Sequence, residues 1–157
     1  MVRGLILALF LWSSAVGAEV LVGRVVGVHD GDTITVLSEV DGKKVSTKVR
    51  LWGIDAPESK QAFGSRAKDE LSGMVFNKAV RVEVQDKDRY GRTVGRVFVG
   101  AVDANLAMVR AGFAWWYQTY AKKATDLQSA EAEARAAKRG LWSDKTPVAP
   151  WAFRREK

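Results

Sequence analysis

The stretch DTITVLSEVDGKKVSTKVRL, residues 32–51, decides the fold of this 157-residue chain. Its first part, residues 32–38, is rich in Thr, Ile and Val, which favour β-strands. Asp41-Gly42 is a strong signal for a tight hairpin turn. The return run then alternates, with one row Val45, Thr47, Val49 and Leu51 and the other Lys44, Ser46, Lys48 and Arg50. The stretch predicts an antiparallel hairpin in which Arg50 points away from the apolar row.

Further strands are predicted on both sides of this hairpin. They cover Val20 to His29, Ala79 to Gln85 and Val94 to Val99. A turn from Asp88 to Thr93 joins the last two. Together with the hairpin these segments give five strands.

Helical patterns occupy the remaining segments. After Pro57, apolar residues recur at three- and four-residue spacing, with Ser59 as N-cap: Phe63, Ala67, Leu71 and Met74. A short helix from Asp103 through Arg110 should stop at Gly112, and a longer one from about Asp126 to Arg139 should stop at Gly140. Five strands with about three packed α-helices predict a β-rich α+β protein, a five-stranded OB-type β-barrel.

The two ends of the chain differ from this middle part. Residues 1–18 combine a basic start, an apolar run and small residues before Ala18, which predicts a secretory signal peptide and a secreted or periplasmic protein. Signal removal would take Arg3 away and lower the net charge from +7 to +6. The expected divisions are this signal, a domain over 19–145 and a partly docked C-terminal tail over 146–157.

Composition narrows the chemistry. The chain has no cysteine, which excludes thiolate metal sites and cysteine nucleophiles. His29 is its single histidine, so a nuclease built on a histidine pair is excluded as well. A positive net charge favours encounter with phosphate polymers, but many basic proteins bind no polyanion, so charge alone does not establish nucleic-acid binding.

Short carboxylates near strand ends indicate a cation site. Asp32 and Asp55 both lie at such positions, and carboxylate oxygens suit a hard cation such as Ca²⁺. Asp30 is expected to bond its own backbone in the Asp-Gly-Asp turn. Arg50 and Arg92 could supply the planar guanidinium forks that grip phosphate oxygens.

Three motifs carry a family resemblance, Asp30-Gly31-Asp32-Thr33, residues 50–58 (RLWGIDAPE) and Asp88-Arg89-Tyr90-Gly91-Arg92. They resemble the active-site signature of the thermonuclease, or staphylococcal nuclease, family, and the likeness runs from about Val25 to Trp142. The resemblance implies that Asp32, Asp55 and the Ala56 carbonyl hold Ca²⁺. It also implies that Glu58 acts on the attacking water while Arg50 and Arg92 clamp the phosphate.

The resemblance further implies substrate contacts. Tyr90 and Tyr120 fall where family members stack a nucleotide, and Arg89 could meet a terminal phosphate. Gln118 stands where another tyrosine is expected, and Ala56 replaces a threonine. The implied activity is Ca²⁺-dependent endonucleolytic cleavage of DNA and RNA, single strands preferred, with weak sequence preference and 3′-phosphate ends. A monomer is the default expectation.

Two other functions stay open. One is a catalytically weak or inactive nucleic-acid-binding module of the OB type, and the other is a hydrolase of a different phosphate ester. The full set of acidic and basic site residues favours the enzyme over the binding module. The aromatic run Trp115-Trp116-Tyr117 could contact bases, although at least one of its side chains is expected in the core.

Overall fold

The computed structural model describes residues 19–156, and its centre is a closed β-barrel. The barrel strands are β1 (Val20–Asp30), β2 (Thr33–Val40), β3 (Lys43–Leu51), β5 (Ala79–Lys87) and β6 (Thr93–Val99). They follow the order β3-β2-β1-β5-β6, and a parallel pairing of β3 with β6 closes the ring. The predicted β-rich α+β fold with a five-stranded OB-type barrel is confirmed.

The hairpin of residues 32–51 forms as its sequence predicts. Strands β2 and β3 pair from Thr33–Arg50 to Val40–Lys43. Asp41 and Gly42 both take positive φ angles, 50° and 72°, as a tight hairpin turn requires. Val49 and Leu51 are buried in the barrel core, whereas Arg50 is only partly covered on the outer side.

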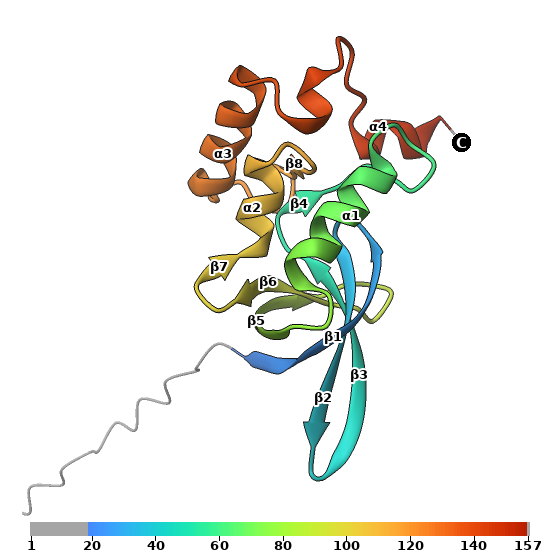
Figure 1. Ribbon diagram of the computed structural model, residues 1–157, viewed down its shortest axis with the longest axis vertical. Coiled ribbons are helices and arrows are strands. Elements are labelled where there is room, and N and C mark those ends of the chain that lie inside the picture. The colour runs from blue at the N-terminus through green and yellow to red at the C-terminus, as the bar shows by residue number, and fades with distance from the viewer. Residues whose placement is uncertain (1–18, 157) are drawn as a thin grey trace, which may run out of the picture.

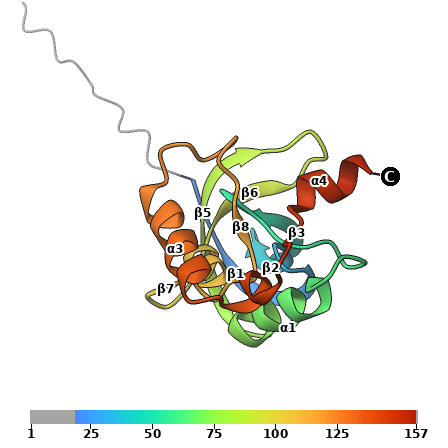
Figure 2. The same cartoon turned by 90° about the horizontal axis from the view of Figure 1, so that it is seen from above.

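Helices gather at one end of the barrel, opposite the tip of the β2–β3 hairpin (Figure 1). They are α1 (Gly64–Val75), α2 (Ala104–Arg110), α3 (Thr125–Ala136) and α4 (Pro150–Arg155), with a 3-10 turn at Gly140–Ser143. The view onto that end shows α1, α3 and α4 on different sides of the barrel (Figure 2). None of the helices within residues 19–156 has the length and apolar content needed to span a bilayer.

The predicted start of the first helix is wrong. Ser59 was expected as N-cap, but Phe63 takes that position with a left-handed φ of 66° and no side-chain cap. The preceding segment turns instead, with Gln61 N–H donating to the Glu58 carbonyl and Gly64 N–H to the Gln61 carbonyl. Gly64 lies so close that an added Cβ would be 2.0 Å from the Glu58 carbonyl oxygen. Glu58 is therefore held on a tight loop rather than on a helix.

Three short strands were not predicted. β7 (Val102–Asp103) extends the sheet beside β6, and β4 (Ile54–Asp55) pairs with β8 (Trp115–Trp116). In the second pair Asp55 lies opposite Trp115. This pairing fixes the backbone of Asp55 against a segment 60 positions later, which local periodicity cannot reveal.

Two polar side chains position helix α2, one at its N-terminus and one that bonds it to the neighbouring strand. Asp103 accepts a hydrogen bond from Leu106 N–H at 3.0 Å, so the predicted N-cap is confirmed. Buried Asn105 donates to the Trp52 and Gly95 carbonyls and accepts from Val97 N–H. One amide thus joins α2, β6 and the segment that leads to Asp55.

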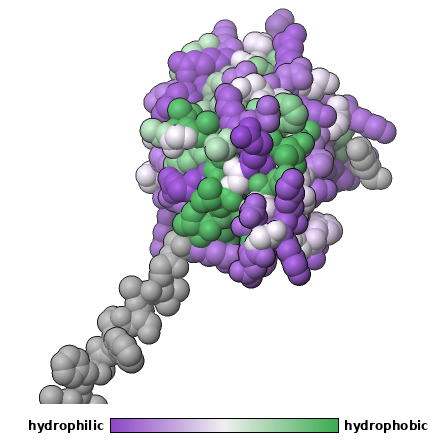
Figure 3. Space-filling view, turned by 60° about the horizontal axis from the view of Figure 1, so that its bottom comes forward, coloured by the Kyte–Doolittle hydropathy of each residue, from purple (hydrophilic) through white to green (hydrophobic). Residues whose placement is uncertain are grey.

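The two chain ends have different outcomes. The predicted signal peptide, residues 1–18, lies outside the described residues. The tail over 146–157 was expected to be partly docked, and it contains the short helix α4. Beside the start of β1, hydrophobic residues gather on the surface between hydrophilic ones (Figure 3), and Val20 and Val22 of β1 are exposed.

Candidate active site

Two buried aspartates face one arginine at the helix-covered end of the barrel. Asp32 and Asp55 are only 5% and 1% exposed. Arg50 Nη1 lies 3.1 Å from Asp32 Oδ2, and Arg50 Nη2 lies 3.0 Å from Asp55 Oδ1. The structure thus brings together three of the residues that the sequence analysis selected.

The turn between β1 and β2 positions Asp32. Asp30 accepts a hydrogen bond from Asp32 N–H at 3.0 Å, which confirms its predicted turn-forming part. Gly31 passes so close to the next motif that an added Cβ would lie 2.7 Å from the Cβ atoms of Ala56 and Ala67. Ala56 N–H donates to Asp32 Oδ2 at 2.6 Å. The Asp30–Thr33 turn and the segment that carries Asp55 and Ala56 are therefore held together by close packing at Gly31 and by a hydrogen bond from a backbone N–H to a carboxylate.

The Arg50 guanidinium is fixed by ion pairs to two carboxylates and by hydrogen bonds to two backbone carbonyls. Besides the two carboxylates, Nη1 donates to the Ile54 carbonyl at 2.9 Å and to the Leu51 carbonyl at 3.2 Å. A planar fork with several donors can satisfy such a set, whereas a lysine ammonium cannot copy its geometry. Arg50 is consequently a fixed positive group between two acids.

The positive charge of Arg50 does not fully offset the burial of Asp32 and the neighbouring negative charges. The pKa of Asp32 is raised to about 8, mainly by burial and also by nearby Asp30 and Asp55, although the positive charge of Arg50 lowers it. Burial favours the neutral acid wherever a carboxylate lacks enough compensating charge. A divalent cation at this position would supply that charge.

The donors present fit a hard cation. Carboxylate oxygens and a backbone carbonyl are the ligands that Ca²⁺ prefers, and water completes its shell. No group of three or more acidic, histidine or cysteine side chains is placed to hold a metal among residues 19–156. The candidate protein ligands are therefore the two carboxylates of Asp32 and Asp55 with the Ala56 carbonyl.

Glu58 lies beside this pair but is bound by a residue that the sequence analysis missed. Arg154 of α4 reaches Glu58 Oε1 through Nη1 at 2.7 Å and Asp55 Oδ2 through Nη2 at 2.7 Å. These two carboxylates hold the pKa of Arg154 above its usual range, against the effect of burial. The sequence offered only Arg154-Arg155 in a tail, and a contact across 99 positions leaves no local signal.

Arg92 lies at the start of β6, next to the end of β3. The pairings of Val49 with Thr93 and of Arg50 with Val94 put Arg92 on the same outer face as Arg50. Its own side chain is paired with Asp88, Nε to Oδ2 at 2.6 Å. Although partial burial opposes it, hydrogen bonding from the Arg92 side chain and backbone holds the pKa of Asp88 below its usual range. Arg92 is thus near the site by register and anchored to its own turn.

The predicted substrate-contact residues are on the surface. Tyr90 is 69% exposed, and Arg89 packs over its ring and donates to its hydroxyl at 2.7 Å. Tyr120 is 70% exposed and meets Tyr117 edge-on, with ring centroids 4.9 Å apart. Both tyrosines therefore expose most of their surface. Trp115, by contrast, is buried, as expected for at least one residue of its run.

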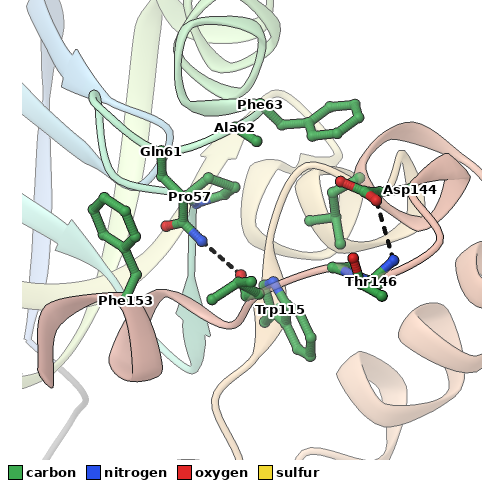
Figure 4. A pocket seen from close by; sticks show the side chains of 11 residues that line it. Pro57, Gln61, Ala62, Phe63, Trp115, Asp144, Thr146 and Phe153 are labelled. Atoms are coloured by element: carbon green, nitrogen blue, oxygen red, sulfur yellow. Dashed lines mark hydrogen bonds between the residues drawn. The ribbon is translucent and has the colours of Figure 1, made fainter. Parts of the chain in front are cut away.

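A pocket of about 210 Å³ lies between the loop after Glu58 and the tail. Its lining includes Pro57, Gln61, Trp115 and Phe153 (Figure 4). Gln61 Nε2 donates to the Val148 carbonyl at 2.5 Å across this pocket (Figure 4). The tail is therefore tied to the loop that carries Glu58.

The fold and the site define an OB-type barrel protein with buried aspartates bridged by an arginine. The sequence model of the family described as staphylococcal nuclease homologue matches residues 48–144. The chain belongs to the staphylococcal nuclease family, which confirms the resemblance of its motifs.

Relatives from enterobacteria cover nearly the whole chain. Protein ParB of Escherichia coli is 45% identical over 96% of this chain and 88% of its own length. A protein named uncharacterized endonuclease, from Escherichia coli O157:H7, is 44% identical over 96% of both chains. The micrococcal nuclease of Shigella flexneri is 44% identical over 85% of this chain and 80% of its own length.

Proposed function

We propose that this protein is a Ca²⁺-dependent endonuclease that hydrolyses phosphodiester bonds of DNA and RNA. The main support for this proposal is that buried Asp32 and Asp55 both pair with Arg50. Glu58 lies close to Asp55, because Arg154 bonds both carboxylates. Relatives named endonuclease and micrococcal nuclease support this function. A purely binding barrel has no chemical need for buried carboxylates beside a phosphate that it must attract.

Asp32, Asp55 and the Ala56 carbonyl are the proposed Ca²⁺ ligands. When bound, Ca²⁺ supplies positive charge that lowers the pKa of a coordinated water and neutralises phosphoryl oxygens. Arg50 holds both carboxylates in place before substrate arrives. To bind the phosphate, the Arg50 guanidinium has to give up some of its bonds to these carboxylates and form bonds to phosphate oxygens instead.

Glu58 is the proposed partner of the attacking water. A carboxylate is a weak base, so the main contribution of Glu58 is to orient the water through a hydrogen bond. Water attacks phosphorus as the bond to the 5′ oxygen breaks. The proton of the water passes to solvent and the 5′ oxygen takes up a proton from solvent, which leaves a 3′-phosphate and a 5′-hydroxyl. A guanidinium stays protonated and is a poor proton donor, so Arg92 stabilises the leaving oxygen by its charge.

The proposed substrate is a flexible nucleic-acid strand. Exposed Tyr90 and Tyr120 can stack on bases, each interaction being worth roughly 1–3 kcal/mol, whatever the base. Arg89 is proposed to meet a terminal phosphate. Stacking and charge act without reading base edges, so we propose weak sequence preference and faster cleavage of single strands than of duplex DNA.

The test is cleavage of heat-denatured DNA with Ca²⁺ or with excess chelator. Chelator should abolish cleavage, and Glu58→Gln should lower the rate by about 100-fold or more. Glu39→Gln is the matched control because Glu39 is exposed on the hairpin, away from the site. Unchanged cleavage in chelator or in Glu58→Gln would remove the mechanism.

The binding-only alternative rests on one observation, namely that arginines already occupy both aspartates. It predicts tight, salt-sensitive binding of single-stranded DNA with no turnover under any divalent ion. Cleavage of a small phosphodiester but not of DNA would instead indicate a different ester as substrate. Either result replaces the endonuclease assignment.

Export is proposed from residues 1–18. The mature protein should begin after Ala18 and lie in the periplasm or the medium. Mass spectrometry of the protein from fractionated cells checks both points, and an intact N-terminus in the cytoplasmic fraction would contradict them.

A further inference from the structure

The C-terminal helix α4 places a cation on the carboxylates of the site. Arg154 bonds both oxygens of Asp55, Nη2 to Oδ2 at 2.7 Å and Nη1 to Oδ1 at 3.2 Å. The same Nη1 donates to Glu58 Oε1 at 2.7 Å. One guanidinium therefore joins a proposed calcium ligand to the proposed water-orienting residue.

Aromatic contacts hold α4 in this position. Trp151 stacks on Tyr117 with ring planes 2° apart and centroids at 5.2 Å, and it meets Trp115 edge-on at 5.4 Å. Upstream of α4, the Gln61 side chain bonds the Val148 carbonyl (Figure 4). Arg154 thus arrives on a docked helix, although its own side chain is still 41% exposed.

Each carboxylate oxygen of Asp55 already accepts a hydrogen bond from an arginine. Arg50 takes Oδ1, and the Arg154 fork takes both oxygens, while Asp55 itself is 1% exposed. Direct coordination of Ca²⁺ requires a carboxylate oxygen within about 2.3–2.6 Å of the ion. The Arg50 side chain is only 15% exposed and is fixed by backbone carbonyls, whereas that of Arg154 is 41% exposed, so Arg154 is the partner that can leave toward solvent.

We propose that Arg154 and Ca²⁺ compete for Asp55, so that α4 is a latch which closes the metal site in the metal-free protein and opens when calcium binds. This inference rests on the proposed calcium site. It adds that the C-terminal helix lowers the apparent affinity for calcium. A mutation that weakens the latch should therefore tighten calcium binding.

The first experiment is calorimetric titration of the full chain with Ca²⁺. Arg154→Gln keeps a polar side chain without the charge, and Arg155→Gln is the matched control on the adjacent exposed arginine. Coupling between two sites is typically worth fivefold or more in affinity. We expect Arg154→Gln to bind Ca²⁺ at least about fivefold more tightly, and Arg155→Gln to stay within about twofold of wild type.

The second experiment follows the helix itself. The chain has no cysteine, so Glu156→Cys creates a unique site for a spin label at the end of α4. Ca²⁺ should increase the mobility of the label in this background. Adding Arg154→Gln should make the label mobile before Ca²⁺ is present.

The outcomes separate the latch from the metal site. Absence of calcium binding in all variants would overturn the proposed site and the latch with it. Calcium binding with equal affinity in wild type and Arg154→Gln, and an unchanged label, would overturn the latch alone. Weaker binding in Arg154→Gln would also overturn it, because Arg154 would then support the site.

Discussion

Ala56 N–H donates a hydrogen bond to the Asp32 carboxylate at 2.6 Å across 24 positions of sequence. This bond joins the turn after β1 to the segment after β4. The same oxygen, Asp32 Oδ2, lies 3.1 Å from Arg50 Nη1, so the backbone bond and the ion pair share one atom. The geometry of the site is therefore built into the main chain and does not depend on side chains alone.

Gly31→Ala tests how closely the two motifs approach. An added Cβ would lie 2.7 Å from the Cβ atoms of Ala56 and Ala67, so the turn must shift. We expect the free energy of unfolding to fall by about 1–3 kcal/mol and calcium affinity to weaken. Gly73→Ala is the control, since its Cβ would meet nothing within 4 Å, and it should raise stability by about 0.5–1 kcal/mol because it lies within α1. Urea unfolding and calorimetry measure both effects.

Arg50→Lys tests whether the fork is needed or only its charge. An ammonium cannot bond Asp32, Asp55 and two carbonyls together, so buried acceptors lose partners. We expect the free energy of unfolding in chelator to fall by about 1–3 kcal/mol and the cleavage rate to fall by about 100-fold. Arg81→Lys, at an exposed ion pair on the barrel, should change stability by less than about 0.5 kcal/mol. Equal stability of wild type and Arg50→Lys would mean that a point charge suffices.

Asp88→Asn tests the anchor of Arg92. The pKa of Asp88 is lowered in the folded protein from 3.8, so its ionised form stabilises the fold above that pH. This contribution is lost as the pH falls through the lowered value. The stability difference between wild type and Asp88→Asn should therefore be present at pH 7 and shrink below about pH 4. Asp41→Asn in the hairpin turn is the control, and denaturant unfolding at several pH values provides the measurement.

Tyr90→Ala and Tyr120→Ala test the exposed rings. Loss of one stacked base should weaken binding of a short single-stranded DNA by about 5- to 150-fold, whereas Phe at either position should retain most of the affinity. Phe76→Ala removes a similarly exposed ring at the end of α1 and should have no effect. Fluorescence anisotropy in chelator measures binding without cleavage. Equal affinity in both Ala variants would exclude these tyrosines from the substrate path.

Local sequence signals predicted most of the barrel and the central acids. Alternation located β3 and the outward face of Arg50, and turn chemistry correctly assigned Asp30. Asp103 was recognised as a cap because the capping bond spans only three residues. These features depend on neighbours in the chain, which one sequence displays directly.

Long-range contacts were beyond such signals. The β4–β8 pair and Arg154 depend on partners 60 to 99 positions away. The first helix begins at Gly64 and not near Ser59, because the chain between them turns so that the backbone of Gly64 packs against Glu58. A periodic pattern of apolar residues does not reveal this close approach. The fixed pairing of Arg92 with Asp88 was missed as well, since Arg92 was interpreted only through the substrate phosphate and Asp88 only as part of a turn.

The parallel pairing of β3 with β6 joins residue 49 to residue 93 and completes the ring. This pairing brings the end of β3, which carries Arg50, beside the start of β6, which follows Arg92, and Asp55 pairs with the still later strand β8. A chain that is still unfolded, or still being synthesised, therefore lacks the assembled candidate site, because that site requires strands that come late in the sequence.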